Sequence, residues 1–180
     1  PSLDDWRKGQ RALFDITFAE PARRAGAQRW GIKEVRLGAE HCAYLRWLYP
    51  RAQFVFLHRN PLDAYRSYCR YGRNWYDTFP DKPVFTPTAF GAHWKHVAGS
   101  FLLQAAELNA LMVRYEDLAS GAFPLEQLET HLRICIDQEL LRGKVGSSER
   151  SGEQAYISKL EQWLLWRAVK PVAAQLDYRP

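Results

Sequence analysis

The sequence predicts an α/β protein whose strands form a parallel sheet. Three short stretches with β-like character, residues 29–37, 53–57 and 110–115, alternate with longer stretches of helical periodicity. Strands that alternate with helices are typical of parallel sheets, because a helical crossover returns the chain to the starting edge of the sheet. The length of 180 residues, 47% of them hydrophobic and 25% charged, suits one globular domain with a sizeable core.

Six helices are expected around these strands. The first should be broken or kinked at Pro21 and the second should stop at Pro50, because proline disrupts a helix interior. Thr88 is the expected N-cap of a later helix, and Pro124 should lead another. The expected helical ranges are 4–27, 39–49, 61–71, 88–108, 123–135 and 157–176.

Composition and charge narrow the class of function. No apolar run approaches the roughly 20 residues of a membrane-spanning helix. The 25 Lys and Arg against 20 Asp and Glu give a net charge of +5, which favours an anionic partner. Arginines and aromatics suggest RNA binding as one alternative, but the dense basic face or recognisable module of nucleic-acid readers is missing, so no nucleic-acid partner is expected.

The three cysteines, Cys42, Cys69 and Cys135, are expected to be buried free thiols. They are widely spaced and odd in number, with no CxxC pair and no metal-ligand spacing, so no metal site is expected. Unpaired thiols are typical of a reducing compartment, so we expect a cytoplasmic protein.

Residues 54–68, FVFLHRNPLDAYRSY, run from an apolar strand directly into charge. The four opening apolar residues predict a central strand covered on both faces. Asn60 is expected to cap the following helix, with Pro61 in its first turn. Arg59 then lies at the carboxyl edge of the sheet beside a helix N-terminus, and both features favour an anion. Ser67 adds a hydroxyl two turns on. The alternative is that Arg59 pairs with a carboxylate at the sheet edge.

These residues carry a resemblance to a known family. HRNPLDAYRSY resembles the 3′-phosphate-binding segment of sulfotransferases that use 3′-phosphoadenylyl sulfate (PAPS). In that family a strand ends in Arg-Asp/Asn-Pro, and a serine follows eight positions after the arginine, where Arg59 and Ser67 stand. Further stretches come in the family's order. WGIKEVR is similar to its lysine-bearing strand, LMVRYEDL to its strand ending in Tyr-Glu-Asp-Leu, and RGKVGSSERSG stands where the family closes over the nucleotide.

The resemblance covers about residues 29–150. It implies a three-layer sandwich with a central parallel sheet flanked by helices, as in P-loop nucleotide-binding proteins. Arg59 and Ser67 would bind the 3′-phosphate of PAPS or of its product PAP, through charge-assisted bonds of about 1.5–3 kcal/mol each. Tyr115 would lie near the adenine, the alternative being a partly buried core tyrosine. Glu116 and Asp117 are expected to cap a helix or turn.

The resemblance also suggests residues for the transfer itself. Lys33 would stabilise charge on the leaving oxygen, the alternative being a surface lysine paired with Glu34. The general base is open among Glu34, His41 and His58, and strand alternation predicts that Glu34 faces away from Lys33.

Two loops are expected to border the site. Lys144, Ser147, Ser148 and Arg150 form a basic stretch suited to phosphate, or a solvated turn. The aromatic loop 75–85 would shape an acceptor pocket or cover the core.

One part of the family pattern is missing. The strand and phosphate loop of the form Pro-x-Ser-Gly-Thr-Thr do not precede Arg29, and ERSG at residues 149–152 follows no strand. We therefore expect a single sulfotransferase-like domain of which this chain is the C-terminal two-thirds, inactive alone. The leading function is sulfuryl transfer from PAPS to a hydroxyl or amine of a small-molecule, glycan or peptide acceptor. The alternative is a non-catalytic module that binds PAP or a partner. Homo-oligomerisation stays open.

Overall fold

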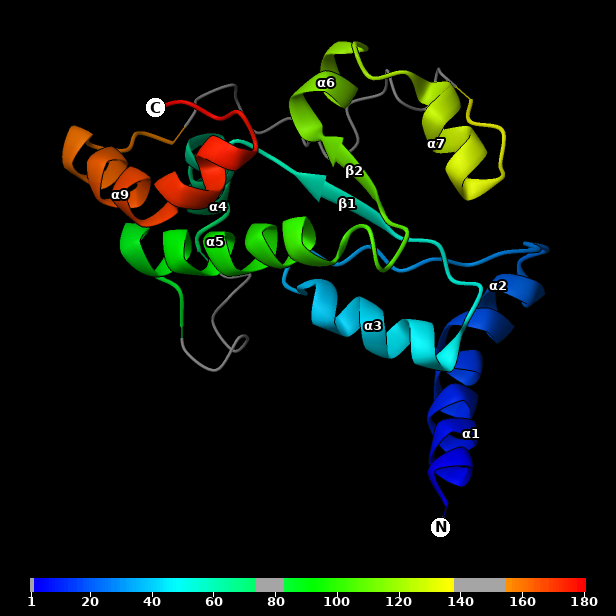
Figure 1. Ribbon diagram of the computed structural model, residues 1–180. Helices are drawn as coiled ribbons and strands as arrows, with labels where there is room; N and C mark the ends of the chain where they lie inside the picture. Colours follow the sequence, from blue (N-terminus) through cyan, green and yellow to red (C-terminus); the bar gives the residue numbers. More distant parts are fainter. Residues whose placement is uncertain (1, 74–82, 138–154) are drawn as a thin grey trace. The chain divides into compact units, whose positions relative to one another are not determined.

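The computed structural model describes residues 2–73, 83–137 and 155–180, which form two units, Pro1–Ala52 and Gln53–Pro180 (Figure 1). The first unit opens with helix α1 (Leu3–Phe14), a π-helical turn η1 (Asp15–Ala19) and helix α2 (Glu20–Arg24). Ser2 and Asp5 form a capping box at the start of α1. Pro21 was expected to break or kink the helix. It lies in the first turn of α2, just after the π-helical turn that interrupts the α-helix, where its missing amide hydrogen matters least.

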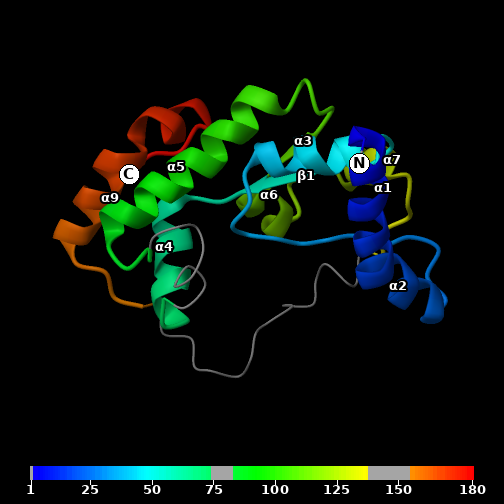
Figure 2. The ribbon, with the colours of Figure 1, turned by 90° about the horizontal axis from the view of Figure 1, so that it is seen from below.

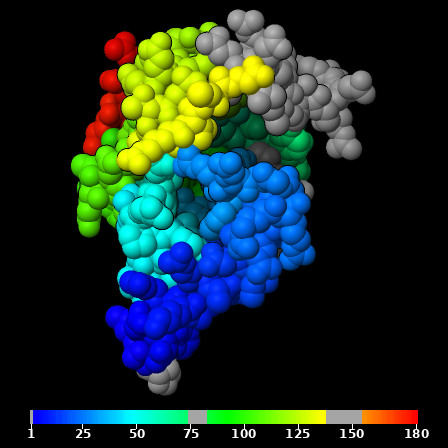
Figure 3. Space-filling view, turned by 90° about the vertical axis from the view of Figure 1, so that its right-hand side faces the viewer, coloured from blue at the N-terminus to red at the C-terminus, as the bar shows by residue number. Residues whose placement is uncertain are grey.

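Aromatic side chains hold the first unit together. The Phe18 and Trp30 rings stack at 5.5 Å between centroids, and Trp30 meets the Tyr49 ring edge-on at 5.5 Å. Helix α3 (Ala39–Leu48) ends just before Tyr49, as expected from the proline at position 50. The Tyr49 hydroxyl donates to Asp15 Oδ1 over 2.9 Å, which ties the end of α3 to the first helices. Figure 3 shows the surface of α1 in dark blue.

The prediction of a strand at residues 29–37 is wrong, because this stretch has no regular secondary structure. The Glu34 carboxylate turns back on its own chain, where it accepts from the amides of Val35 and Arg36 at 2.8 and 3.1 Å. It also binds the Arg36 guanidinium at 2.8 Å. A side chain that takes up neighbouring amides in this way competes with a strand ladder.

The second unit contains two parallel strands, β1 (Val55–His58) and β2 (Leu111–Arg114), in the register Val55↔Leu111 to His58↔Arg114. The parallel pairing confirms the expected α/β character. The expectation that β1 is covered on both faces is wrong for the part of the chain the structure describes. Phe56 is 2% exposed and stacks on Phe101, but the next residue, Leu57, is 46% exposed, so burial alternates along the strand.

Five helices of the second unit are described, and the expected helices correspond to four of them. They are α4 (Pro61–Arg70), α5 (Pro87–Gln104), α6 (Tyr115–Ser120), α7 (Leu125–Leu132) and α9 (Lys159–Gln175). Thr86, not Thr88, caps α5, since its side chain accepts from the Ala89 amide. Ser158 and Glu161 form a capping box at α9. No helix within the described ranges has the length and apolar character needed to cross a membrane.

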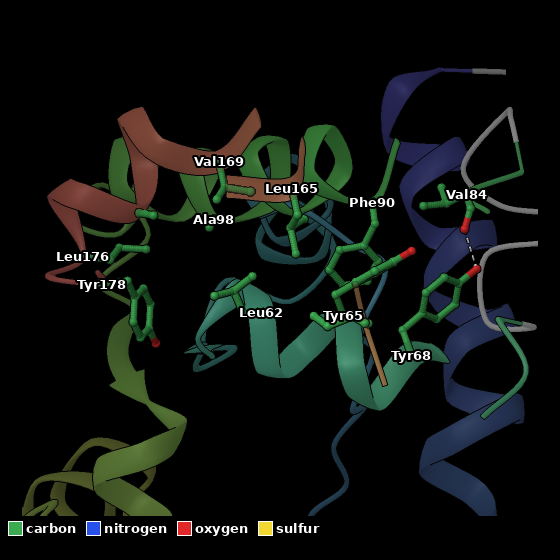
Figure 4. Close-up of a cluster of buried hydrophobic side chains, with 12 residues drawn as sticks. Leu62, Tyr65, Tyr68, Val84, Phe90, Ala98, Leu165, Val169, Leu176 and Tyr178 are labelled. Atoms are coloured by element: carbon green, nitrogen blue, oxygen red, sulfur yellow. Dashed lines mark hydrogen bonds between the residues drawn. The ribbon is translucent and has the colours of Figure 1, made fainter. Parts of the chain in front are cut away.

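Helices α4, α5 and α9 enclose the core of the second unit, with α5 and α9 side by side (Figures 1 and 2). Tyr65, Phe90, Leu165 and Val169 meet there (Figure 4). Tyr68 is fully buried, and its hydroxyl donates to the Val84 carbonyl oxygen over 2.7 Å. The core thus packs α4 against two long helices.

Candidate functional site

The carboxyl edge of the two strands brings two of the expected residues together. The parallel register sets His58 beside Arg114, so the next residues along each chain, Arg59 and Tyr115, also become neighbours. The Arg59 Cζ atom lies 4.4 Å from the centroid of the Tyr115 ring. Tyr115 is 37% exposed, so it is not a core tyrosine. A cation–π contact at an exposed site contributes about 0.5–1 kcal/mol.

The charge of Arg59 is not neutralised within the ranges that the structure covers. No carboxylate there lies in ion-pair distance of its guanidinium, so the alternative of a structural ion pair finds no partner in that part of the chain. Its Nε atom is buried and has no hydrogen-bond partner among the same residues. A guanidinium that rests on an aromatic ring and has no carboxylate partner can bind an anion through its terminal nitrogens.

The N-terminus of α4 contributes less than expected to such a site. Pro61 has no amide hydrogen, and the amides of Leu62 and Asp63 both donate to Asn60 Oδ1, at 2.9 and 3.4 Å. The Ala64 amide donates to the Asn60 carbonyl oxygen at 2.9 Å. Asn60 therefore caps the helix as predicted, but in doing so it occupies the amides that an anion could have used. Side chains must therefore supply the hydrogen-bond donors to any anion bound at this edge.

Ser67 is the second expected phosphate ligand. It lies half-buried on α4, seven residues beyond Asn60. At 1.5 Å of rise per residue this is about 10 Å along the helix, and seven residues make nearly two full turns, so Ser67 shares the face on which the chain enters. Over the described residues its hydroxyl makes no side-chain hydrogen bond, and no direct contact with Arg59 is present.

A polar network joins the carboxyl ends of β1 and β2 next to Arg59. Glu116 Oε1 accepts from the Asn60 amide at 2.8 Å, and Glu116 Oε2 accepts from the Tyr178 hydroxyl at 3.1 Å. The Tyr178 hydroxyl also lies 2.8 Å from His58 Nδ1. Arg114 stacks over the Tyr178 ring at 4.6 Å, and its Nε lies 3.5 Å from Glu116 Oε2. Glu116 and Asp117 lie in the first turn of α6, as expected, and Glu116 also bridges β1, β2 and the last residues of the chain.

The protonation of this network follows from its surroundings. Burial raises the pKa of Tyr178, and the neighbouring Glu116 raises it further. Burial alone would raise the pKa of Glu116, but the bonds from Asn60 and Tyr178 and the charge of Arg114 outweigh it and lower the pKa. Burial lowers the pKa of His58. The carboxylate can only accept, so Tyr178 donates to it, and a neutral His58 donates its Nδ1 hydrogen to the tyrosine oxygen.

The expected catalytic residues Lys33, Glu34 and His41 all lie in the first unit. Lys33 is exposed, and its alternative role as a partner of Glu34 is not seen, because that carboxylate binds Arg36. The hydrogen bond from Arg36 lowers the pKa of Glu34 to about 2, so Glu34 would hold an acceptor's proton weakly. His41 is half-buried on α3, with Nδ1 3.3 Å from Glu40 Oε1.

Other expectations are untested or corrected. Lys144, Ser147, Ser148, Arg150 and most of the 75–85 loop fall outside the described residues. All three cysteines are free, as expected, but Cys135 is exposed and follows α7, and the other two are half-buried. In the described ranges no group of three His, Cys, Asp or Glu could hold a metal ion.

Sequence reasoning missed Tyr178 and the structural role of Glu116. The two residues stand 62 positions apart, and their contact depends on packing that no local pattern reports. The positions of Arg114 and His58 were easier to predict. They lie at or next to the ends of two predicted parallel strands, and residues at the ends of neighbouring parallel strands meet at one edge.

Comparison with known proteins gives the family. A model of the sulfotransferase family matches residues 2–133, which include both strands and the Arg59–Tyr115 pair. The chain therefore belongs to the sulfotransferase family. No curated protein and no solved structure matches significantly. Family membership supports sulfuryl transfer as the class of chemistry.

Proposed function

We propose that this chain carries the 3′-phosphate half of a PAPS site in a sulfotransferase whose complete domain is a three-layer α/β sandwich. The observation that carries the proposal is the Arg59–Tyr115 pair at the carboxyl edge of two parallel strands, with its charge unpaired over the described residues. This is the edge at which open parallel sheets bind ligands. Among family members a nucleotide sulfate donor is typical, and the pair fits an anionic group next to an aromatic base.

Each residue has a role in the proposal. Arg59 and Ser67 donate to the 3′-phosphate, and the exposed Tyr115 ring packs against the adenine. Lys144, Ser147 and Arg150 would complete the phosphate contacts. Because the α4 amides are occupied by Asn60, removing either side-chain donor should not be compensated by the main chain.

In the reaction the bond between sulfur and the 5′-phosphate oxygen breaks as a bond forms between sulfur and the acceptor's oxygen or nitrogen. The acceptor loses a proton to a base, and PAP leaves with the bonding electrons. Lys33 is the proposed cation for the charge on that leaving oxygen. The firmly ionised Glu34 suits the base role poorly, which leaves His41 and His58 as the proposed candidates for the base.

The proposal is tested by calorimetric titration of the chain with PAP and with AMP, which lacks only the 3′-phosphate. We expect PAP to bind more tightly, and Arg59→Ala to lower its affinity between about 10- and 150-fold, the equivalent of about 1.5–3 kcal/mol. Ser67→Ala should act in the same direction, and neither variant should change AMP binding much.

Arg167→Ala is the matched control. Arg167 also stacks on an aromatic ring, with Cζ 5.5 Å from the Trp163 centroid, but it lies on the exposed face of α9. Its removal should leave PAP binding unchanged. Equal affinity of the wild-type chain for PAP and AMP would overturn the 3′-phosphate assignment.

A further inference from the structure

The peptide group between Arg59 and Asn60 is held at both of its polar ends. Its carbonyl oxygen accepts from Trp94 Nε1 on α5 at 3.1 Å, and its N–H donates to Glu116 Oε1 at 2.8 Å. The Cα atom that bears the Arg59 side chain is directly attached to this peptide. The orientation of the peptide therefore sets where the guanidinium lies on Tyr115.

We propose that Glu116, fastened by Tyr178, is a positioning residue for recognition of the 3′-phosphate. The inference rests on the proposed function, because it concerns how Arg59 is aimed at that phosphate. Both oxygens of Glu116 are engaged, since Oε1 accepts from the Asn60 amide and Oε2 from the Tyr178 hydroxyl, and a carboxylate has no hydrogen to donate to a phosphate. It acts through the main chain of its neighbours.

Tyr178 is built into the core and not merely laid on the surface. It is 2% exposed, and its ring packs edge-on against Trp94 at 6.2 Å and against His58 at 5.6 Å. In Figure 4 its ring lies beside Leu176, and its hydroxyl points away from the other labelled core side chains. The Tyr178 ring thus packs on Trp94, and its hydroxyl binds Glu116. One residue therefore supports both of the groups that hydrogen-bond the Arg59–Asn60 peptide.

The direction of the hydrogen bonds in this network is set by the carboxylate, which can only accept. Tyr178 accepts from His58 and donates to Glu116, so its one hydrogen needs an acceptor at Oε2. A glutamine can keep the amide bond to Asn60 through its oxygen, but then it presents an NH₂ group to the tyrosine, so Tyr178 can no longer donate to residue 116 and can donate only to His58 in its Nε2–H tautomer. A phenylalanine at position 178 removes both of the hydroxyl's hydrogen bonds and keeps the packing. Glu116→Gln and Tyr178→Phe therefore break the same link from its two sides.

The test measures PAP and AMP affinities by calorimetry for these two variants, alone and combined with Arg59→Ala. Each single variant should lose about tenfold in PAP affinity, the equivalent of one hydrogen bond of about 1.4 kcal/mol, with little change for AMP. In the Arg59→Ala background neither change should cost further PAP affinity, because the positioned group is gone. A purely structural role would instead lower the affinity for both nucleotides.

Two matched controls and a fold check complete the design. Glu107→Gln, in the turn after α5, and Tyr156→Phe change exposed residues of the same types and should leave both affinities unchanged. Circular dichroism and thermal unfolding establish that every variant is folded at the titration temperature. Glu116→Gln keeps the shape of the side chain, so it still tests the positioning role of Glu116 if Tyr178→Phe unfolds.

The outcomes separate this inference from the function on which it rests. If the wild-type chain prefers PAP and Arg59→Ala abolishes the preference, but Glu116→Gln binds PAP as the wild type does, positioning by Glu116 is refuted and the 3′-phosphate site stands. Further loss of PAP affinity in the Arg59→Ala background would also refute it. If the wild type shows no preference for PAP, the proposed function falls and the inference falls with it.

Discussion

Replacing Gly91 by alanine should destabilise the protein, although alanine is the better helix former. Gly91 is buried on α5 where that helix crosses α9. A Cβ atom at this position would lie 2.8 Å from the Ala168 Cβ, 3.1 Å from Leu165 Cδ1 and 3.2 Å from the Leu165 carbonyl oxygen. Favourable carbon contacts need about 3.5–4.0 Å. Because one of these atoms belongs to the backbone of α9, the helices must move apart.

The magnitude follows from comparison with Gly99, on the same helix. A Cβ there meets only Val172 Cγ2, at 3.5 Å, which is an ordinary contact. Alanine gains about 0.8–1.0 kcal/mol of helix propensity at either position. Overpacking costs about 1–3 kcal/mol and applies only to Gly91→Ala. The propensity gain cancels in the comparison, so Gly99→Ala should exceed Gly91→Ala in the free energy of unfolding by about 1–3 kcal/mol.

Urea denaturation followed by circular dichroism gives both free energies of unfolding. Gly99→Ala should raise the midpoint above that of the wild type, and Gly91→Ala should lower it with an unchanged slope. If Gly91→Ala proves as stable as Gly99→Ala, the close approach of α5 and α9 at Gly91 is refuted.

Three further predictions concern charge, capping and thiol reactivity. The pKa of Glu116 is lowered from its ordinary value of 4.5, so its carboxylate stabilises the fold at pH values above 4.5. This stabilisation is lost as the pH falls below 4.5. The thermal midpoint of Glu116→Gln should therefore fall less steeply with acid than that of the wild type. Ser158→Ala removes the cap of α9 and should lower the free energy of unfolding in urea by about 1 kcal/mol, and an unchanged value would contradict the capping box. Peptide mapping after iodoacetamide treatment should find Cys135 modified first and Cys42 last, because Cys135 is exposed, whereas burial raises the pKa of the Cys42 thiol to about 11. Faster reaction at Cys42 would contradict this order.

The elements with strong local signals were predictable from the sequence. The β1–α4 segment combines a run of apolar residues with Asn60 and Pro61 at a helix start, and both residues occupy those places in the structure. Residues 29–37 show the limit of such signals. Their composition resembles a strand, but pairing and burial make a strand, and here Glu34 binds local amides instead.

The candidate site, like the fold, was predictable only in part from the sequence. Arg59 and Tyr115 could be placed at one edge in advance, because both stand at the carboxyl ends of predicted parallel strands. That Asn60 occupies amides of α4 follows from the predicted cap, since an asparagine N-cap accepts from the amides of the first turn; which of them it takes depends on its rotamer. The Glu116–Tyr178 bond, which joins residues 62 positions apart, could not be anticipated. Long-range polar contacts of this kind leave no periodicity in a single sequence.

The capped start of α4 also bears on how easily the site could be redesigned. An anion site made of backbone amides resists change, because every residue type except proline supplies the same N–H group. Here Asn60 already occupies those amides, so the preference between phosphorylated nucleotides would depend on a few exchangeable side chains. Substitutions at Arg59 and Ser67 should therefore retune which nucleotide is bound while the strand, the helix and their connection stay intact.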